Sequence, residues 1–164
     1  MPILDEVRAA NAAYADEFAK GGLAMPPARK FAVLACMDAR LDPAKALGLA
    51  EGDAHVIRNA GGRASDDALR SLVISQQLLG TEAVIVVHHT DCGMLTFTND
   101  QLRDTVRERL GVDTAGTDFL PFADVDQSVR DDVAAIRASR LVPDEVAVSG
   151  FVYDVRSGAL RQVD

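Results

Sequence analysis

The sequence lacks Trp, contains only two Cys and has no long hydrophobic run. Two Cys are too few for a disulfide framework, which excludes a disulfide-stabilised small scaffold. The longest uninterrupted apolar runs, residues 31–37 and 83–87, are far shorter than the ~20 residues that cross a bilayer. The first residues, Met-Pro-Ile-Leu-Asp-Glu-Val, have no basic segment, so we expect no secretory signal.

An excess of basic residues is also missing. Seventeen Lys and Arg against 25 Asp and Glu leave a formal net charge of −8, and a negative surface repels nucleic acids and anionic membranes. The length of 164 residues fits one domain. With 48% hydrophobic and 26% charged residues, the chain is neither a disordered tail nor a collagen-like fibre. We therefore expect a small cytoplasmic enzyme or binding domain, with no nucleic-acid or membrane partner.

The first thirty residues differ from the rest of the chain. Apolar residues at spacings that fit one helical face precede a glycine pair and a proline pair. These are Leu4, Val7, Tyr14 and Phe18, then Gly21-Gly22 and Pro26-Pro27. The pattern predicts a helical arm, ended by the glycines, and a connector in residues 1–30, followed by a domain in residues 31–164. Such a helix packs either on its own domain or on a partner subunit, and the sequence leaves both open.

From residue 31 onward, short apolar runs alternate with segments of helical periodicity. This alternation predicts an α/β fold with a mostly parallel sheet flanked by helices. In such sheets, ligands bind at the carboxyl ends of the strands. Strands are predicted at residues 31–36, 54–59 and 83–88, and a fourth begins at 145–148, with 151–155 either continuing it or pairing beside it. Helices are predicted from the Ser65 cap to Gly80, from the Thr98–Gln101 capping box to Gly111, and over residues 122–136.

Polar groups follow two of these strands. The first ends in Cys36-Met37-Asp38-Ala39-Arg40 and the third in His88-His89-Thr90-Asp91-Cys92-Gly93. If the chain stays extended, the strand period of two sends Cys36, Asp38 and Arg40 to one side. Two thiolates and an imidazole are good zinc ligands, and three protein ligands leave an open fourth position, as in catalytic sites. Softer metals also accept these ligands.

Each residue also has an ordinary structural interpretation. A Cys that ends an apolar strand is often a small buried hydrophobic residue, and Asp-x-Arg is often a surface ion pair. We expect His88 to be structural and His55 to be a partly exposed strand residue. The presence of all these ligand types at the ends of two strands favours the metal site.

The order Cys36-x-Asp38-x-Arg40, then Val56–Gly61, then His89-x-x-Cys92-Gly93 resembles the β-class carbonic anhydrase signature, most closely that of short bacterial members. The resemblance implies zinc on Cys36, His89 and Cys92, with Asp38 and Arg40 as a catalytic dyad. It also implies a four-stranded parallel core with an added edge strand. The expected assembly is a homodimer or a dimer of dimers, with the N-terminal helix on the neighbouring subunit.

The expected activity is reversible hydration of CO2 to bicarbonate and a proton by a zinc-bound hydroxide that the dyad orients. Asp38 would become a fourth zinc ligand in a closed form, and Arg40 can hold it off the metal. Ala60, Gly61 and Gly62 are expected to line a small apolar pocket. Without Trp, the Trp-lined inhibitory bicarbonate pocket of some relatives cannot exist in the same form, which favours an open site near neutral pH. The alternatives are a carbonyl sulfide or carbon disulfide hydrolase with the same zinc site, and a non-catalytic zinc-binding regulatory protein.

Overall fold

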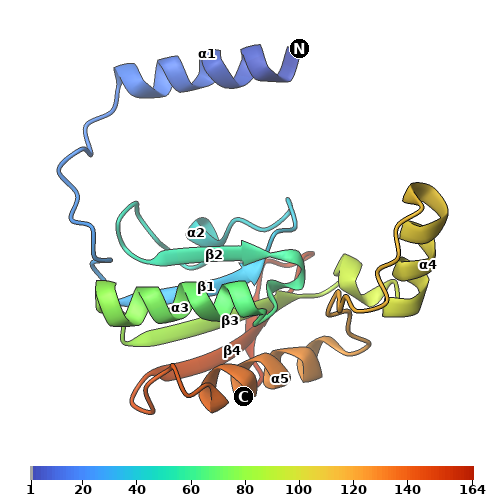
Figure 1. Ribbon diagram of the computed structural model, residues 1–164. Helices are drawn as coiled ribbons and strands as arrows, with labels where there is room; N and C mark the ends of the chain where they lie inside the picture. Colours follow the sequence, from blue (N-terminus) through green and yellow to red (C-terminus); the bar gives the residue numbers. More distant parts are fainter. Residues whose placement is uncertain (1) are drawn as a thin grey trace.

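The computed structural model describes residues 2–164 and is built around one five-stranded sheet (Figure 1). Its strand order is β2-β1-β3-β4-β5, and only β5 is antiparallel to its neighbour. The predicted fold class, with four parallel strands and an added edge strand, is confirmed. The strands are β1 (Phe31–Cys36), β2 (His55–Asn59), β3 (Ala83–His89), β4 (Ala147–Tyr153) and β5 (Leu160–Gln162).

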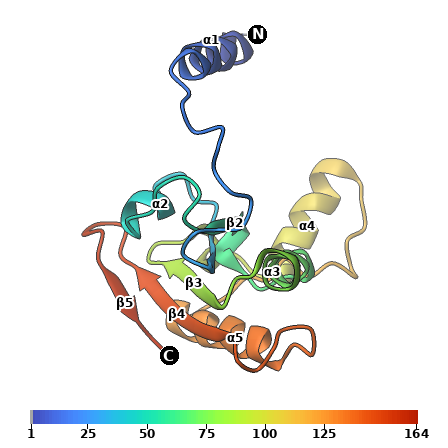
Figure 2. The same ribbon diagram turned by 90° about the vertical axis from the view of Figure 1, so that its left-hand side faces the viewer.

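Helices cover the two faces of the sheet unequally. On one face, α3 (Asp66–Leu79) and α5 (Val125–Ala138) bury the larger apolar core, whereas the short α2 (Pro43–Ala46) and the loop after it cover the other (Figure 2). All six residues of β1 are buried, which explains why its sequence is apolar throughout rather than alternating. α4 (Asn99–Leu110) projects from the body of the domain (Figure 1).

The helix caps match the sequence prediction more closely than the other boundaries do. Ser65 caps α3, the Thr98–Gln101 capping box opens α4, and Gly80 and Gly111 end these helices in the left-handed conformation. The third predicted helix starts later than expected. α5 begins at Val125, because Asp124 caps it, and Phe122 lies before it. Residues 147–153 form one continuous strand, which settles the alternative left open for the fourth strand.

The chain reverses its direction of travel across the sheet between β1 and β3. It leaves β1 toward β2 on one side, then returns through α3 to β3 on the other side of β1. Ligand sites of open α/β sheets lie at such a switch point, outside the carboxyl ends of the strands. Here those ends are Cys36 and His89.

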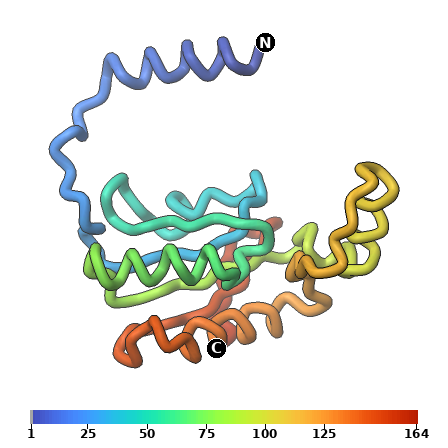
Figure 3. Tube along the Cα trace, viewed as in Figure 1, coloured from blue at the N-terminus to red at the C-terminus, as the bar shows by residue number. Residues whose placement is uncertain are grey.

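The N-terminal arm stands apart from the domain. α1 (Pro2–Asp16) has no buried residue, and residues 17–30 connect it to β1 (Figure 3). The helix ends at Asp16, so the prediction that Gly21-Gly22 stops it was wrong. The last turn of α1 and the connector contact the domain at Glu51, which accepts a 2.9 Å hydrogen bond from Tyr14 of α1 and pairs with Lys20 of the connector. None of the helices in residues 2–164 is both long and apolar enough to cross a membrane.

Deleting residues 1–20 is expected to weaken self-association. The apolar side chains of the arm are roughly half exposed, Leu4 at 45%, Val7 at 57% and Tyr14 at 53%, and an isolated helix of this length is marginal in water. A second copy of the chain would bury this face. Light scattering across a dilution series should show a full-length dimer or larger assembly that dissociates more readily after the deletion.

A point substitution provides a matched control for that deletion. Val7→Asp places a charge on the apolar face and should weaken association, whereas Ala9→Asp lies on the opposite face of the helix and should not. A full-length chain that stays monomeric at high concentration would contradict this prediction.

Candidate metal centre

Three side chains that can bind a metal meet at the ends of β1 and β3. One ligand atom each from Cys36, His89 and Cys92 lies within 4.8 Å of the other two, and all three residues are buried. The two Sγ atoms are 4.0 Å apart. This is the grouping that the sequence predicts, and within residues 2–164 it is the only cluster of its kind.

Met37 still donates to the Asn59 carbonyl of β2 at 2.8 Å, and the chain then turns at Asp38 instead of continuing as a strand. The Asp38 carboxylate accepts a 2.9 Å hydrogen bond from the backbone N–H of Arg40, and Leu41 donates to the Asp38 carbonyl at 3.0 Å. Strand periodicity would place Arg40 beside Asp38 only if the chain stayed extended, and it does not, because the short polar side chain of Asp38 forms a turn with its own backbone. Arg40 still reaches Asp38, but by folding back onto it.

One ring nitrogen of His89 is hydrogen-bonded, and among residues 2–164 the other has no hydrogen-bond partner. Its Nδ1 lies 2.9 Å from the Thr90 carbonyl, which can only accept, so Nδ1 carries the proton. Its Nε2 is buried and has no hydrogen-bond partner. A backbone carbonyl on one imidazole nitrogen is the usual outer support of a metal-binding histidine. A buried Nε2 without a hydrogen-bond partner among residues 2–164 fits a metal ligand.

The two cysteine Sγ atoms are close enough to share one proton, and either can be the donor. The contact with Cys92 lowers the pKa of the Cys36 thiol. Hydrogen bonds from His89 and from the backbone N–H groups of Asp38 and Gly61 lower it further, because they stabilise the thiolate. The same contact, together with burial, raises the pKa of Cys92. A cation that replaced the shared proton would stabilise both sulfurs as thiolates.

Asp38 and Arg40 form a two-point ion pair beside this cluster. Arg40 donates from Nε to Asp38 Oδ1 at 3.0 Å and from Nη2 to Oδ2 at 2.8 Å. Hydrogen bonds from Arg40 hold the pKa of the Asp38 carboxyl well below its usual range. Asp38 Oδ2 lies 3.8 Å from His89 Nε2, so the carboxylate borders the ligand cluster while it is bound to Arg40.

Two further arginines support the site, and the sequence analysis did not identify them. Arg58, on edge strand β2, donates to the carbonyls of Cys36 at 3.0 Å and Asp38 at 2.7 Å. Arg63 binds Asp132 of α5 through two nitrogens, at 2.8 and 3.2 Å. The sequence signal for Arg58 was its place in the Val56–Gly61 segment, and the structure pairs Arg58 with Ala35 of β1.

His88 is structural, as predicted. Its Nδ1 lies 2.7 Å from Ser128 Oγ, and its Nε2 lies 3.1 Å from Asp132. Burial opposes ionisation of Asp132, but hydrogen bonds from His88 and Arg63 outweigh it and lower the pKa of its carboxyl. Phe122, which precedes α5, stacks on the His88 ring at 5.5 Å. His55 is half-buried and pairs with Ser75 Oγ at 2.7 Å, away from the metal ligands.

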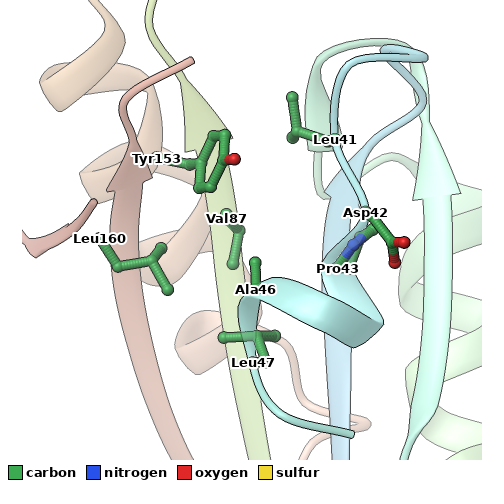
Figure 4. A pocket seen from close by; sticks show the side chains of 8 residues that line it. All are labelled: Leu41, Asp42, Pro43, Ala46, Leu47, Val87, Tyr153 and Leu160. Carbon is green, nitrogen blue, oxygen red and sulfur yellow. The ribbon is translucent and has the colours of Figure 1, made fainter. Parts of the chain in front are cut away.

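The predicted pocket residues lie close to Cys36 but differ from one another in solvent exposure. Ala60 is exposed, whereas Gly61 and Gly62 are buried. The close-up in Figure 4 shows a different apolar pocket, below the strand ends, into which Val87 points from β3. Its lining residues are Leu41, Asp42, Pro43, Ala46, Leu47, Val87, Tyr153 and Leu160. A substrate pocket at residues 60–62 remains a prediction.

Comparisons with known proteins decide the family. Residues 31–160 match the family described as carbonic anhydrase. The chain is 46% identical over 164 residues to β-carbonic anhydrase 1 of Mycobacterium tuberculosis, covering 99% of both. The chain belongs to the β-carbonic anhydrase family. The match spans both ligand-bearing strand ends.

Solved structures and a further relative extend this picture of the carbonic anhydrase fold. The crystal structure of carbonic anhydrase from Streptococcus mutans superposes with a TM-score of 0.96 at 48% identity, covering 100% of this chain and 99% of that one. A carbon disulfide hydrolase of Acidithiobacillus thiooxidans is 33% identical, over 85% of this chain and 79% of its own length. Proteins similar to this chain are therefore named for different small substrates.

Proposed function

We propose that this β-carbonic anhydrase family member is a zinc enzyme that reversibly hydrates CO2 to bicarbonate and a proton. The observation that carries the proposal is the unpartnered His89 Nε2 between two buried cysteines, with the Asp38–Arg40 ion pair next to it. A purely structural zinc site needs no such ion pair and is closed by a fourth protein ligand. This disfavours a non-catalytic regulatory protein.

Cys36, His89 and Cys92 would hold the zinc, because two thiolates and one neutral imidazole match its preferred ligands. Zinc bound there would lower the pKa of a coordinated water and so supply the nucleophile for CO2. The Thr90 carbonyl keeps the proton on His89 Nδ1 and leaves Nε2 free for the metal. The support from Thr90 and Arg58 fixes the ligands before the metal arrives.

Asp38 would orient the nucleophile by accepting its hydrogen bond. It is suited to this role because hydrogen bonds from Arg40 keep it ionised, with its pKa well below the usual range. Its side chain is 18% exposed, so it faces the site without being freely solvated. Arg40 would hold both carboxylate oxygens and keep Asp38 off the metal.

The single most informative experiment is a stopped-flow assay of purified protein with quantified zinc. CO2, carbonyl sulfide and carbon disulfide would be supplied in parallel, since all three are linear and apolar. We expect CO2 hydration to exceed hydrolysis of either sulfur compound. Preferential hydrolysis of carbon disulfide would instead favour the alternative suggested by the Acidithiobacillus relative.

Arg40→Ala is expected to lower activity and shift what remains to higher pH. The released Asp38 carboxylate would move toward the metal position, where hydroxide competes with it better as pH rises. A pH–rate profile, with a crystal structure near neutral pH, measures both effects. Unchanged rates with Asp38 in its original place would show that Arg40 is not part of the dyad.

Arg40→Lys provides the comparison for charge alone. Lys keeps the positive charge but not the planar two-point geometry, so it should restore only part of the activity. Full recovery with Lys would mean that charge, rather than the hydrogen bonds at 3.0 and 2.8 Å, keeps Asp38 in place.

We also propose a dimer or dimer of dimers, and a cytoplasmic location where the two thiols stay reduced.

A further inference from the structure

A second carboxylate binds Arg40 from the other strand end. Asp91 stands between His89 and Cys92 in the sequence, and its Oδ2 accepts a 2.8 Å hydrogen bond from Arg40 Nη1. Its backbone carbonyl accepts another from Arg40 Nη2, also at 2.8 Å. Nothing in the Cys-x-Asp-x-Arg pattern accounts for this residue.

The guanidinium of Arg40 therefore spans the two loops that carry the ligands. One edge faces Asp38, in the loop after β1, and the other faces Asp91, in the loop after β3. A planar guanidinium whose nitrogens are engaged on both sides has one orientation. The Arg40 side chain is 47% exposed, so without the Asp91 carboxylate only Asp38 and the backbone carbonyl of residue 91 would oppose its rotation into solvent.

The backbone at Asp91 is suited to this contact. Its φ of 55° is in the left-handed region, which Asp and Asn enter more readily than most other residues. The Asp91 side chain is itself 72% exposed, and within residues 2–164 it makes no hydrogen bond to Asp38 or to either cysteine sulfur. Arg40 is the group that the Asp91 side chain binds directly, so Asp91 can act on Asp38 through Arg40.

We propose that Asp91 is a positioning residue for the CO2 hydration inferred above. It holds Arg40 across the two loops, and Arg40 in turn holds Asp38 at the edge of the ligand cluster. This inference rests on the proposed function. The competing interpretation is that Asp91 only shapes the turn between His89 and Cys92.

Two substitutions separate these interpretations. Asp91→Asn keeps an oxygen acceptor and a residue type that tolerates the left-handed turn, but removes the charge. Asp91→Gly removes the whole side chain and still adopts the turn. Asp67→Asn is the control for loss of one negative charge, because Asp67 pairs only with Arg70 on the exposed surface of α3.

We expect kcat of Asp91→Gly to fall about tenfold, as for other outer partners of metal ligands. KM should change little, Asp91→Asn should retain more activity, and Asp67→Asn should match the unsubstituted protein. The pH–rate profile of Asp91→Gly should shift to higher pH, as expected for Arg40→Ala. In the Arg40→Ala background, Asp91→Gly should cause no further loss, because residues acting through one another are not additive.

A readout independent of activity is the visible absorption of the cobalt(II)-substituted protein, which reports the metal's ligands. Asp91→Gly should shift this spectrum toward that of Arg40→Ala, with metal content unchanged. An additive loss in the double variant, or an unshifted spectrum, would overturn the positioning role. A wild-type protein that fails to hydrate CO2 would refute the proposed function, while the cobalt spectra would still test whether Asp91 positions Arg40.

Discussion

Replacing Cys92 with Ser is expected to remove most of the zinc and, with it, the activity. Cys92 is 3% exposed and its Sγ lies 4.0 Å from that of Cys36. A Ser hydroxyl is a poor zinc ligand because it stays protonated near neutral pH, whereas a coordinating thiol is deprotonated. The loss should exceed the roughly 10–100-fold typical of outer partners. Plasma emission measures the zinc, and stopped-flow hydration measures the activity.

Two histidine variants make the same test without touching a sulfur. His89→Gln should lose zinc, whereas His55→Gln should keep it, because His55 pairs with Ser75 outside the cluster. Far-UV circular dichroism would show that each variant has folded. Full zinc retention by Cys92→Ser would refute the assignment of the three ligands.

Gly62→Ala is expected to destabilise the domain by about 2–5 kcal/mol. A Cβ at this position would lie 2.9 Å from Cys36 N and 3.0 Å from both Ala35 C and Val87 O. These are backbone atoms of β1 and β3, so relief requires the two strands to move. Overpacking costs about 1–3 kcal/mol, and the left-handed backbone, with φ of 70°, adds about 1–2 kcal/mol. Urea unfolding measures the loss.

Gly80→Ala is a control that separates the steric effect of the added Cβ from the effect of the backbone conformation. Gly80 has the same φ of 70°, but a Cβ there would have no neighbour within 4 Å. Gly80→Ala should therefore lower the free energy of unfolding only by the backbone contribution of about 1–2 kcal/mol. Equal losses at the two positions would show that Gly62 is required for its backbone conformation and not for the close approach of η1 (Ala60–Gly62) to the strands.

Much of this architecture can be predicted from the sequence, because its signals are local. The apolar run at residues 31–36 has no alternation, which indicates a strand buried on both faces. Ser65 and Gly80 act on the helix they bound, and the structure places both as caps. The meeting of Cys36 with His89 also follows, because β1 and β3 are parallel neighbours whose carboxyl ends share one edge.

The remaining features depend on contacts between distant segments. Phe122 continues the apolar periodicity of α5, yet it packs on His88 and lies outside the helix, which Asp124 caps. The turn after Asp38 depends on a side-chain hydrogen bond that strand periodicity does not include. Asp91 looks like an ordinary loop residue until Arg40 is seen to reach it across 51 positions of sequence.

Cys36 ends β1 and Cys92 lies in the loop after β3, 56 residues further along the chain, and this separation also bears on how the protein matures. Closing a loop of that length has an entropic cost that the chain meets only when the sheet assembles. The ligand cluster therefore does not exist in the newly made, unfolded chain, and metal binding would follow the pairing of β1 with β3. An ion bound there would connect two distant parts of the chain, and its binding free energy would add to the free energy of folding.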